Sequence, residues 1–200
     1  MRILCIGDVV GEPGRRLLEE LLPPLRRELA VDFVVVNGEN AAHGHGITER
    51  IARQCLDELG VDVVTTGNHA FDVKDITACF QREPRLLRPA NHPSGTPGNG
   101  YVKLHTRSGE EVLVVNLMGR VYMPPCDDPF RCMDAVLAKE RADVVIVDFH
   151  KEITSEAQAL GWYLDGRVAA VVGTHTHVPT LDAKVLPGGT AYVTDLGMTG

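Results

Sequence analysis

Acids, amides and imidazoles recur in this sequence in one kind of place, at or just after the end of a run of apolar, mostly β-branched residues. The residues in these places are Asp8, Glu39, Asn40, Asn68, His69, His150, His175 and His177. In an open α/β sheet, ligands bind at the carboxyl ends of the strands, so we expect these side chains to gather at that edge. Carboxylate, amide and imidazole ligands favour manganese or iron over metals that prefer thiolates. The sequence therefore predicts a metal centre.

The strongest single signal is the pair His175 and His177. Both residues follow an apolar run, and imidazole is the commonest metal-ligating side chain. If the backbone stays extended there, the two rings point to the same side. A set of mostly neutral ligands with a shared carboxylate also suits two ions, and paired ions activate water and stabilise an in-line phosphoryl displacement. The pattern therefore favours phosphoryl chemistry.

Each of these residues alone also has an ordinary structural interpretation. Asp8 could cap the helix expected near Pro13, and Asn68 could be a turn residue. His150 could be a core histidine with satisfied hydrogen bonds. The segment 43–46, His-Gly-His-Gly, is interpreted as a flexible wall of the pocket and not as a further metal site.

The elements that must position these residues alternate along the chain. Apolar runs predict strands buried on both faces at residues 2–6, 33–36, 61–66, 112–115, 144–147, 169–172 and 191–194. Helical spacing predicts helices at 13–29, 48–59, 75–81, 128–139 and 154–164, with Thr48 as an N-cap and a break or kink at Pro23 and Pro24. This alternation predicts a layered α/β domain with helices on both faces of a sheet. The Pro- and Gly-rich segment 84–100 predicts a long surface excursion.

The charge balance limits the class of partner. With 27 acidic and 20 basic residues the net charge is −7, which disfavours long nucleic acid because such binding starts from a basic surface. A small anionic substrate stays allowed, because a bound metal can dominate the local field. Five cysteines without a CxxC pair argue against a disulfide framework and a thiolate zinc site, and favour a reducing cytoplasm.

Length and composition predict a single domain over residues 1–200. No apolar run approaches the ~20 residues of a membrane span, so no membrane partner is expected, and the N-terminus shows no export signal. The strand predicted at 191–194 has no helix after it. This suggests a truncated chain or an element supplied by a partner, and a homo-oligomer is compatible with it.

Several of these blocks resemble a known superfamily. Gly7-Asp8, Gly67-Asn68-His69 and Gly173-Thr174-His175-Thr176-His177 resemble, in that order, the blocks of the calcineurin-like metallophosphoesterases. Together with Asn37-Gly38-Glu39-Asn40-Ala41 and Asp148-Phe149-His150, they resemble the bacterial YmdB-type phosphodiesterase subgroup, which acts on cyclic nucleotides. The resemblance spans essentially all 200 residues. It implies a metallophosphoesterase-type layered sandwich with central, mostly parallel β-sheets flanked by helices.

The sequence departs from the wider superfamily at two positions, and the subgroup shares both departures. Val10 stands where a metal-binding histidine is usual, and Glu39 stands where a bridging aspartate is usual. The resemblance implies that Asn40 replaces the lost imidazole. It implies one ion held by Asp8, Glu39, Asn40 and His177, and a second ion held by Glu39, Asn68, His150 and His175. Glu39 would bridge the two ions.

The resemblance also implies an activity and the residue that assists it. His69 would donate a proton to the leaving oxygen, and an alkoxide leaving group needs such help. The expected reaction is hydrolysis of 2′,3′-cyclic and/or 3′,5′-cyclic nucleoside monophosphates by a metal-bridging hydroxide. Two ions are expected, iron or manganese, with magnesium or zinc as alternatives. The rival functions are a phosphomonoesterase or other binuclear metallohydrolase, and a nucleotide-binding regulator that does not hydrolyse its ligand.

Overall fold

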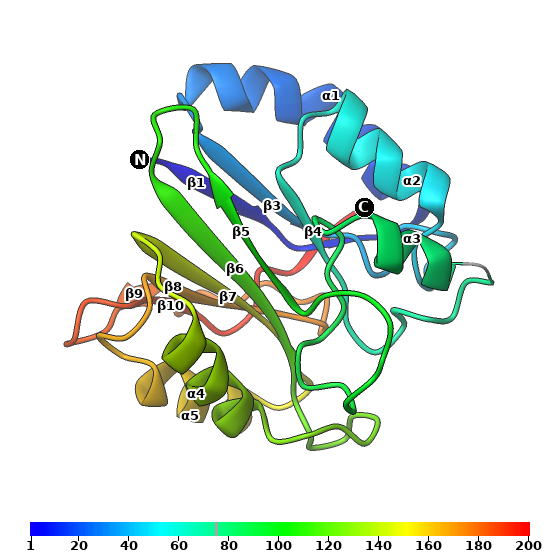
Figure 1. The fold of residues 1–200 in the computed structure, drawn as a ribbon. Coiled ribbons are helices and arrows are strands. Elements are labelled where there is room, and N and C mark those ends of the chain that lie inside the picture. The colour runs from blue at the N-terminus through cyan, green and yellow to red at the C-terminus, as the bar shows by residue number, and fades with distance from the viewer. Residues whose placement is uncertain (75) are drawn as a thin grey trace.

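A computed structural model describes residues 1–74 and 76–200 and shows four layers, with helices outside and two β-sheets between them (Figure 1). The first sheet has the order β1-β3-β4 and is parallel: β1 (Ile3–Ile6), β3 (Phe33–Asn37) and β4 (Val63–Thr65). The second has the order β5-β6-β7-β8-β10-β9: β5 (Tyr101–His105), β6 (Glu111–Met118), β7 (Val144–His150), β8 (Ala170–Thr174), β10 (Ala191–Val193) and β9 (Lys184–Val185). Its edge strands β5 and β9 are antiparallel to their neighbours, and its four central strands are parallel.

Alternating side chains on the strands explain why more than one sheet forms, as the resemblance implied, where the alternation of runs alone indicated one. In β3, Val34 and Val36 face the helices of the first half, while Phe33 and Val35 face the second sheet. Successive side chains of a strand point to opposite faces, so a strand that is apolar at every position is buried on both sides. The apolar runs predict this burial on both faces correctly, but they do not show whether helices or a second sheet cover each face. The predicted layered sandwich with mostly parallel sheets is confirmed.

The helices divide between the two outer faces. Those covering the first sheet are α1 (Gly11–Glu28), α2 (Glu49–Arg53), the π-helical turn η1 (Gln54–Glu58) and α3 (Ile76–Arg82), and those covering the second are α4 (Pro129–Lys139) and α5 (Thr154–Tyr163). Thr48 caps α2 as predicted, because its hydroxyl accepts a hydrogen bond from the Ile51 amide at 3.2 Å. The predicted start of the third helix at Asp75 lies outside the described residues.

Of the break or kink predicted at Pro23 and Pro24, the break does not occur, since α1 runs through both prolines. Leu18 and Leu22 are buried against the sheet, and the Arg26 side chain bonds the Gly60 carbonyl, so packing holds the helix on both sides of the pair. The carbonyls that lose their partners lie on the exposed face, where water can satisfy them.

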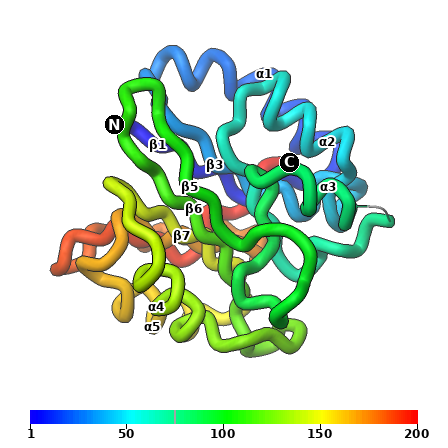
Figure 2. Tube along the Cα trace, in the orientation of Figure 1, coloured from blue at the N-terminus to red at the C-terminus, as the bar shows by residue number. Residues whose placement is uncertain are grey.

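A short parallel pair joins the beginning and the end of the chain. β2 (Asp8–Val9) pairs with β11 (Met198–Thr199), and the Val10 amide donates to the Thr199 carbonyl at 2.9 Å. Figure 2 shows the red end of the tube returning to the blue strands of the first sheet. Asp8 is thereby held in a strand of its own, which the sequence did not predict.

The segment 84–100 is only in part the surface excursion that was expected. Leu86 and Leu87 are fully buried and form bridges to Val64 and Asn99. Within the described part of the chain, no helix has the length and apolar character needed to cross a membrane.

Candidate metal centre

The sheet edges bring the eight predicted site residues to one end of the molecule. Asp8 lies in β2, Glu39 and Asn40 follow β3, and Asn68 and His69 follow β4. From the second sheet, His150 ends β7, and His175 and His177 follow β8. The carboxyl edges of both sheets thus contribute to one site, which is the arrangement that the strand-end pattern predicted.

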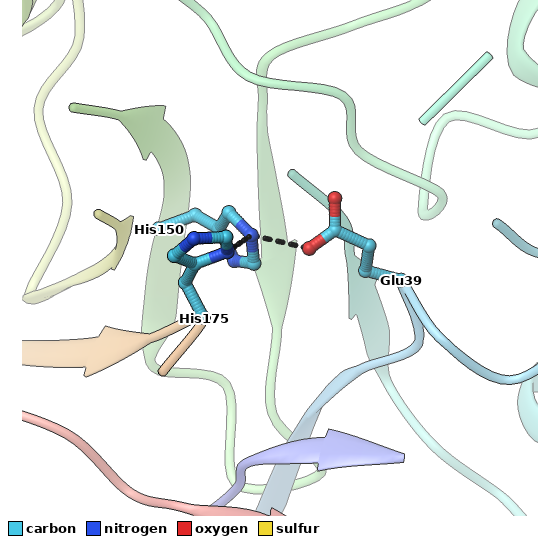
Figure 3. A group of neighbouring side chains, drawn as sticks. All are labelled: Glu39, His150 and His175. Carbon is cyan, nitrogen blue, oxygen red and sulfur yellow. Dashed lines mark hydrogen bonds and ion pairs between the residues drawn. The ribbon is translucent and has the colours of Figure 1, made fainter. Parts of the chain in front are cut away.

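One group of donor atoms converges on His150. Its Nε2 lies 3.1 Å from Asn68 Oδ1 and 3.0 Å from His175 Nδ1, and it pairs with Glu39 Oε2. Figure 3 shows the His150 ring facing the Glu39 carboxylate, with the His175 ring beside it. Ligand atoms of Glu39, His150 and His175 all lie within 4.8 Å of one another, so these three residues could hold a metal ion.

A second group lies on the other side of Asp8. His177 Nε2 is 3.2 Å from Asn40 Oδ1 and 3.9 Å from Asp8 Oδ1. The same Asp8 oxygen lies 3.9 Å from His150 Nδ1, so the two groups are neighbours. The interpretation of Asp8 as a helix cap is excluded, because Val10 occupies the N-cap position of α1 and no side chain caps it.

Two buried carboxylate oxygens show that this donor set fits a cation. Asp8 Oδ1 and Glu39 Oε2 are fully buried; Asp8 Oδ1 has no hydrogen-bond partner among the described residues, and Glu39 Oε2 contacts the Nε2 of His150. A buried carboxylate is costly unless it is paired or coordinates a metal. These buried oxygens, with amide and imidazole atoms around them, match the ligand preferences of manganese and iron.

Burial and neighbouring charges shift the pKa values of the site residues. Burial raises the pKa of Asp8 to about 6, although the positive charge of His150 opposes this shift. Burial also favours neutral Glu39, but the charge and contact of His150 outweigh it and lower the pKa of Glu39. For His150, burial is outweighed by the Glu39 carboxylate, which raises the pKa of His150 to about 9. The two carboxylates thus attract positive charge into a buried place.

The loop that carries His175 and His177 is not extended, so the condition under which both rings were expected to point the same way is not met. The φ angles of these residues are 106° and 62°, in the left-handed region that non-glycine residues rarely adopt. Two buried carboxylates hold this loop: Asp8 accepts the His175 amide at 3.0 Å, and Asp195 accepts the Thr176 amide at 3.2 Å. The left-handed turns direct the two imidazoles into the two different groups.

His69 lies beside these groups and is oriented by a residue that the sequence reasoning missed. Its amide donates to Glu39 Oε1, and its Nδ1 lies 2.6 Å from Asp72 Oδ2. The ring is 29% exposed, and its edge meets the His45 ring at a centroid distance of 4.9 Å. The spacing of three residues between His69 and Asp72 within a turn was the available signal. The segment 43–46 lies beside His69, as a pocket wall would.

The comparison with protein families decides the relationship. The sequence matches the family of YmdB-like proteins over residues 4–200. The chain belongs to the YmdB-like family. The resemblance to the YmdB-type subgroup is therefore confirmed.

Relatives within this family extend beyond the matched chain. A Bacillus subtilis (strain 168) protein, named 2′,3′-cyclic-nucleotide 2′-phosphodiesterase, is 52% identical over 100% of this chain and 76% of its own length. The crystal structure of a hypothetical protein from Thermus thermophilus has 54% identity and a TM-score of 0.94, covering 100% of this chain and 77% of that one. A structure described as a novel phosphatase from Mycoplasma pneumoniae has 35% identity and a TM-score of 0.91, covering 98% and 71%. The YmdB-like fold thus spans the whole chain.

Proposed function

We propose that this protein is a metal-dependent phosphodiesterase that hydrolyses small cyclic nucleotides, with 2′,3′-cyclic and 3′,5′-cyclic monophosphates as substrates. The observation that carries the proposal is the convergence of Glu39, Asn68 and His175 on the Nε2 of His150, beside the buried Asp8 Oδ1, which has no hydrogen-bond partner among the described residues. The name of the B. subtilis relative supports phosphodiester hydrolysis and the 2′,3′-cyclic substrate.

The ligand sets follow the two groups of donor atoms. Asp8, Glu39, Asn40 and His177 would hold one ion, and Glu39, Asn68, His150 and His175 would hold the other. Glu39 is the member common to both sets. The ligand types favour iron or manganese, with magnesium or zinc as alternatives. When bound, such ions supply activation of a water molecule and neutralise charge on the phosphate oxygens.

His69 acts as the general acid in this proposal. Its Nδ1 pairs with Asp72, which leaves Nε2 to donate a proton to the departing ribose oxygen. The hydrogen bond that the His69 backbone amide donates to Glu39 Oε1 fixes the position of His69 relative to this shared ligand. The hydrogen bond between Nδ1 and the Asp72 carboxylate fixes the orientation of the ring.

The proposed partner is a small nucleotide, and neither long nucleic acid nor a membrane is part of the proposal. The net charge of −7 supports a small ligand over long nucleic acid, because the latter requires a basic surface. A cytoplasmic location, the single-domain organisation and a homo-oligomer stay predictions from the sequence.

A substrate panel tests the proposal against its rivals. The purified protein is assayed on 2′,3′-cyclic and 3′,5′-cyclic nucleotides, bis-p-nitrophenyl phosphate and p-nitrophenyl phosphate, with metal analysis of the same sample. We expect diester hydrolysis that a chelator abolishes and manganese restores. Faster turnover of the monoester would favour the phosphomonoesterase alternative, which the M. pneumoniae phosphatase relative keeps open. Stoichiometric nucleotide binding without turnover would indicate a regulator.

The substitution Asn40→Ala is expected to weaken binding of one ion by about tenfold or more and to spare the other. The reason is that Asn40 Oδ1 lies 3.2 Å from His177 Nε2, while the group around His150 contains no atom of Asn40. Chelator competition with Mn²⁺ measures both dissociation constants. Asn40→Asp, which keeps an oxygen ligand, serves as the control. Wild-type affinities and rate in Asn40→Ala would mean that Asn40 is only a turn residue.

The substitution Asp72→Asn is expected to retain metal and to lower the rate on cyclic nucleotides by about 10–100-fold. The asparagine can still accept from His69 Nδ1, but it lacks the negative charge that makes this hydrogen bond strong and holds the ring in place. The kcat on a 2′,3′-cyclic nucleotide and the metal content are measured together. An unchanged kcat would show that Asp72 has no influence on the acid.

A further inference from the structure

We propose that Asp148 is a positioning residue that acts through Thr174 to keep the proton of His150 on Nδ1, so that Nε2 stays free to bind a metal ion. The proposal rests on the ligand role of His150 given above. It concerns a residue that contacts neither the donor group around Nε2 nor any expected substrate atom.

Asp148 lies at the centre of a buried network that joins the two sheets. It is located on β7, two residues before His150, and is 2% exposed. Its Oδ1 accepts the Thr174 hydroxyl at 2.7 Å, from the neighbouring strand β8. Its Oδ2 accepts the Asn37 amide at 3.1 Å and the Thr65 hydroxyl, both from the first sheet. All three neighbours are donors, which is the environment that a carboxylate requires when it is removed from water.

The hydrogen bond that Asn37 Oδ1 accepts fixes the orientation of the Asn37 side-chain amide. Asn37 Oδ1 accepts the backbone amide of Glu39 at 3.1 Å, so Nδ2 must face Asp148 and Thr174. The two hydrogens of Nδ2 serve Asp148 Oδ2 and Thr174 Oγ1, the latter at 3.2 Å. The network that surrounds Asp148 therefore also holds the backbone of the shared ligand Glu39.

Counting the hydrogens on Thr174 then determines the tautomer of His150. The Thr174 hydroxyl has one hydrogen, and the Asp148 carboxylate takes it. The two other atoms near Thr174 Oγ1, the amide nitrogen of Asn37 and the Nδ1 of His150 at 3.0 Å, must both donate to it. His150 Nδ1 therefore carries a hydrogen. When the ring is neutral, as it must be to bind a metal ion, its lone pair therefore lies on Nε2, where Asn68, His175 and Glu39 converge.

The arrangement is a carboxylate–hydroxyl–imidazole chain in place of the direct carboxylate–histidine contact common at metal sites. Through the Thr174 hydroxyl, the Asp148 carboxylate favours a hydrogen on His150 Nδ1 without placing a further negative charge against the imidazole. Two carboxylates already approach this ring, since Glu39 contacts Nε2 and Asp8 Oδ1 lies 3.9 Å from Nδ1.

The test compares Thr174→Val, which keeps the shape and removes the hydroxyl, with Thr174→Ser, which restores a hydroxyl. Thr190→Val is the matched control, because Thr190 is equally buried but bonds the Leu164 and Val168 carbonyls. Zn²⁺ affinity is measured by chelator competition, and the ring nitrogens are observed by ¹H–¹⁵N NMR of the Zn²⁺-loaded protein. Zn²⁺ serves here as a diamagnetic probe.

We expect the wild type and Thr174→Ser to show His150 protonated on Nδ1 and bound through Nε2. Thr174→Val and Asp148→Asn should lose about 10–100-fold in affinity for one Zn²⁺ and retain the other, while Thr190→Val loses none. A Zn²⁺ bound through Nδ1 of His150, or wild-type affinity in Thr174→Val, would overturn the positioning role. Absence of Zn²⁺ binding in the wild type would overturn the metal assignment itself, which separates the two failures.

Discussion

His69→Ala is expected to keep its metal ions and to lose about 10²–10⁴-fold in the rate on a cyclic nucleotide. The metal should stay because the contact of His69 with Glu39 is made by the backbone amide, which alanine retains. The rate should fall because the substitution removes the ring that Asp72 orients. The loss should be much smaller on bis-p-nitrophenyl phosphate, since p-nitrophenolate leaves without a proton.

The ratio of wild-type to variant rate on these two substrates, with metal content measured for both proteins, checks this result. His105→Ala is the control, because His105 lies beside Glu111 at the opposite edge of the second sheet. Equal losses on the two substrates would mean that His69 is not the general acid. Loss of metal would make it a ligand or a structural residue.

Glu39→Gln is expected to reduce the content of both metal ions and to abolish most of the activity. Both proposed ligand sets share Glu39, so one substitution removes a negative charge from two sites. The affinity of each ion should fall by more than the roughly 10–100-fold that loss of an outer-shell partner costs. Metal stoichiometry after dialysis against a weak chelator is the measurement.

The matched control for this substitution is Glu152→Gln. Glu152 approaches His175 Nε2 at 2.9 Å, but its side chain is 46% exposed, so the variant removes the same charge next to the same site. We expect it to retain both ions. Two ions per chain in Glu39→Gln would contradict the bridging role, and equal depletion in Glu152→Gln would mean that net charge, not ligation, controls binding.

Much of the fold could be predicted because apolar runs and polar strand ends are local signals. The strands at 33–36 and 144–147 and the cap at Thr48 were identified in this way and are confirmed. The run pattern alone could not predict the division into two sheets, which only the family resemblance implied, because a second sheet and a helix layer bury a strand equally well. The two-residue strands β2 and β11 are too short to give any periodicity. The continuity of α1 through Pro23 depends on packing, which a proline rule does not include.

For the site too, features that depend on local sequence could be predicted, and features that depend on distant contacts could not. All eight predicted residues lie at one end of the two sheets, because a strand end fixes where a residue lies. The left-handed conformation of His175 was not predictable, since it depends on the hydrogen bond that its backbone amide donates to Asp8, 167 residues away. Asp72 and Asp148 were missed as contributors because their roles depend on which side chains they meet. Ligand types can be read from a sequence, but the hydrogen bonds that orient them require the fold.

The pairing of β2 with β11 has a consequence for the order of events during synthesis. Translation proceeds at about 5–20 residues per second, so residue 198 is made roughly 10–40 s after residue 8. Asp8 and Glu39 therefore leave the ribosome well before His175 and His177 exist, and Asp8 waits longer still for its strand partner Met198. Until His150 is made, the nascent chain carries at most four of the seven proposed ligands. On the proposed ligand sets, neither metal site would be complete before His175 is made, after β8 and before β9 and β10 of the second sheet.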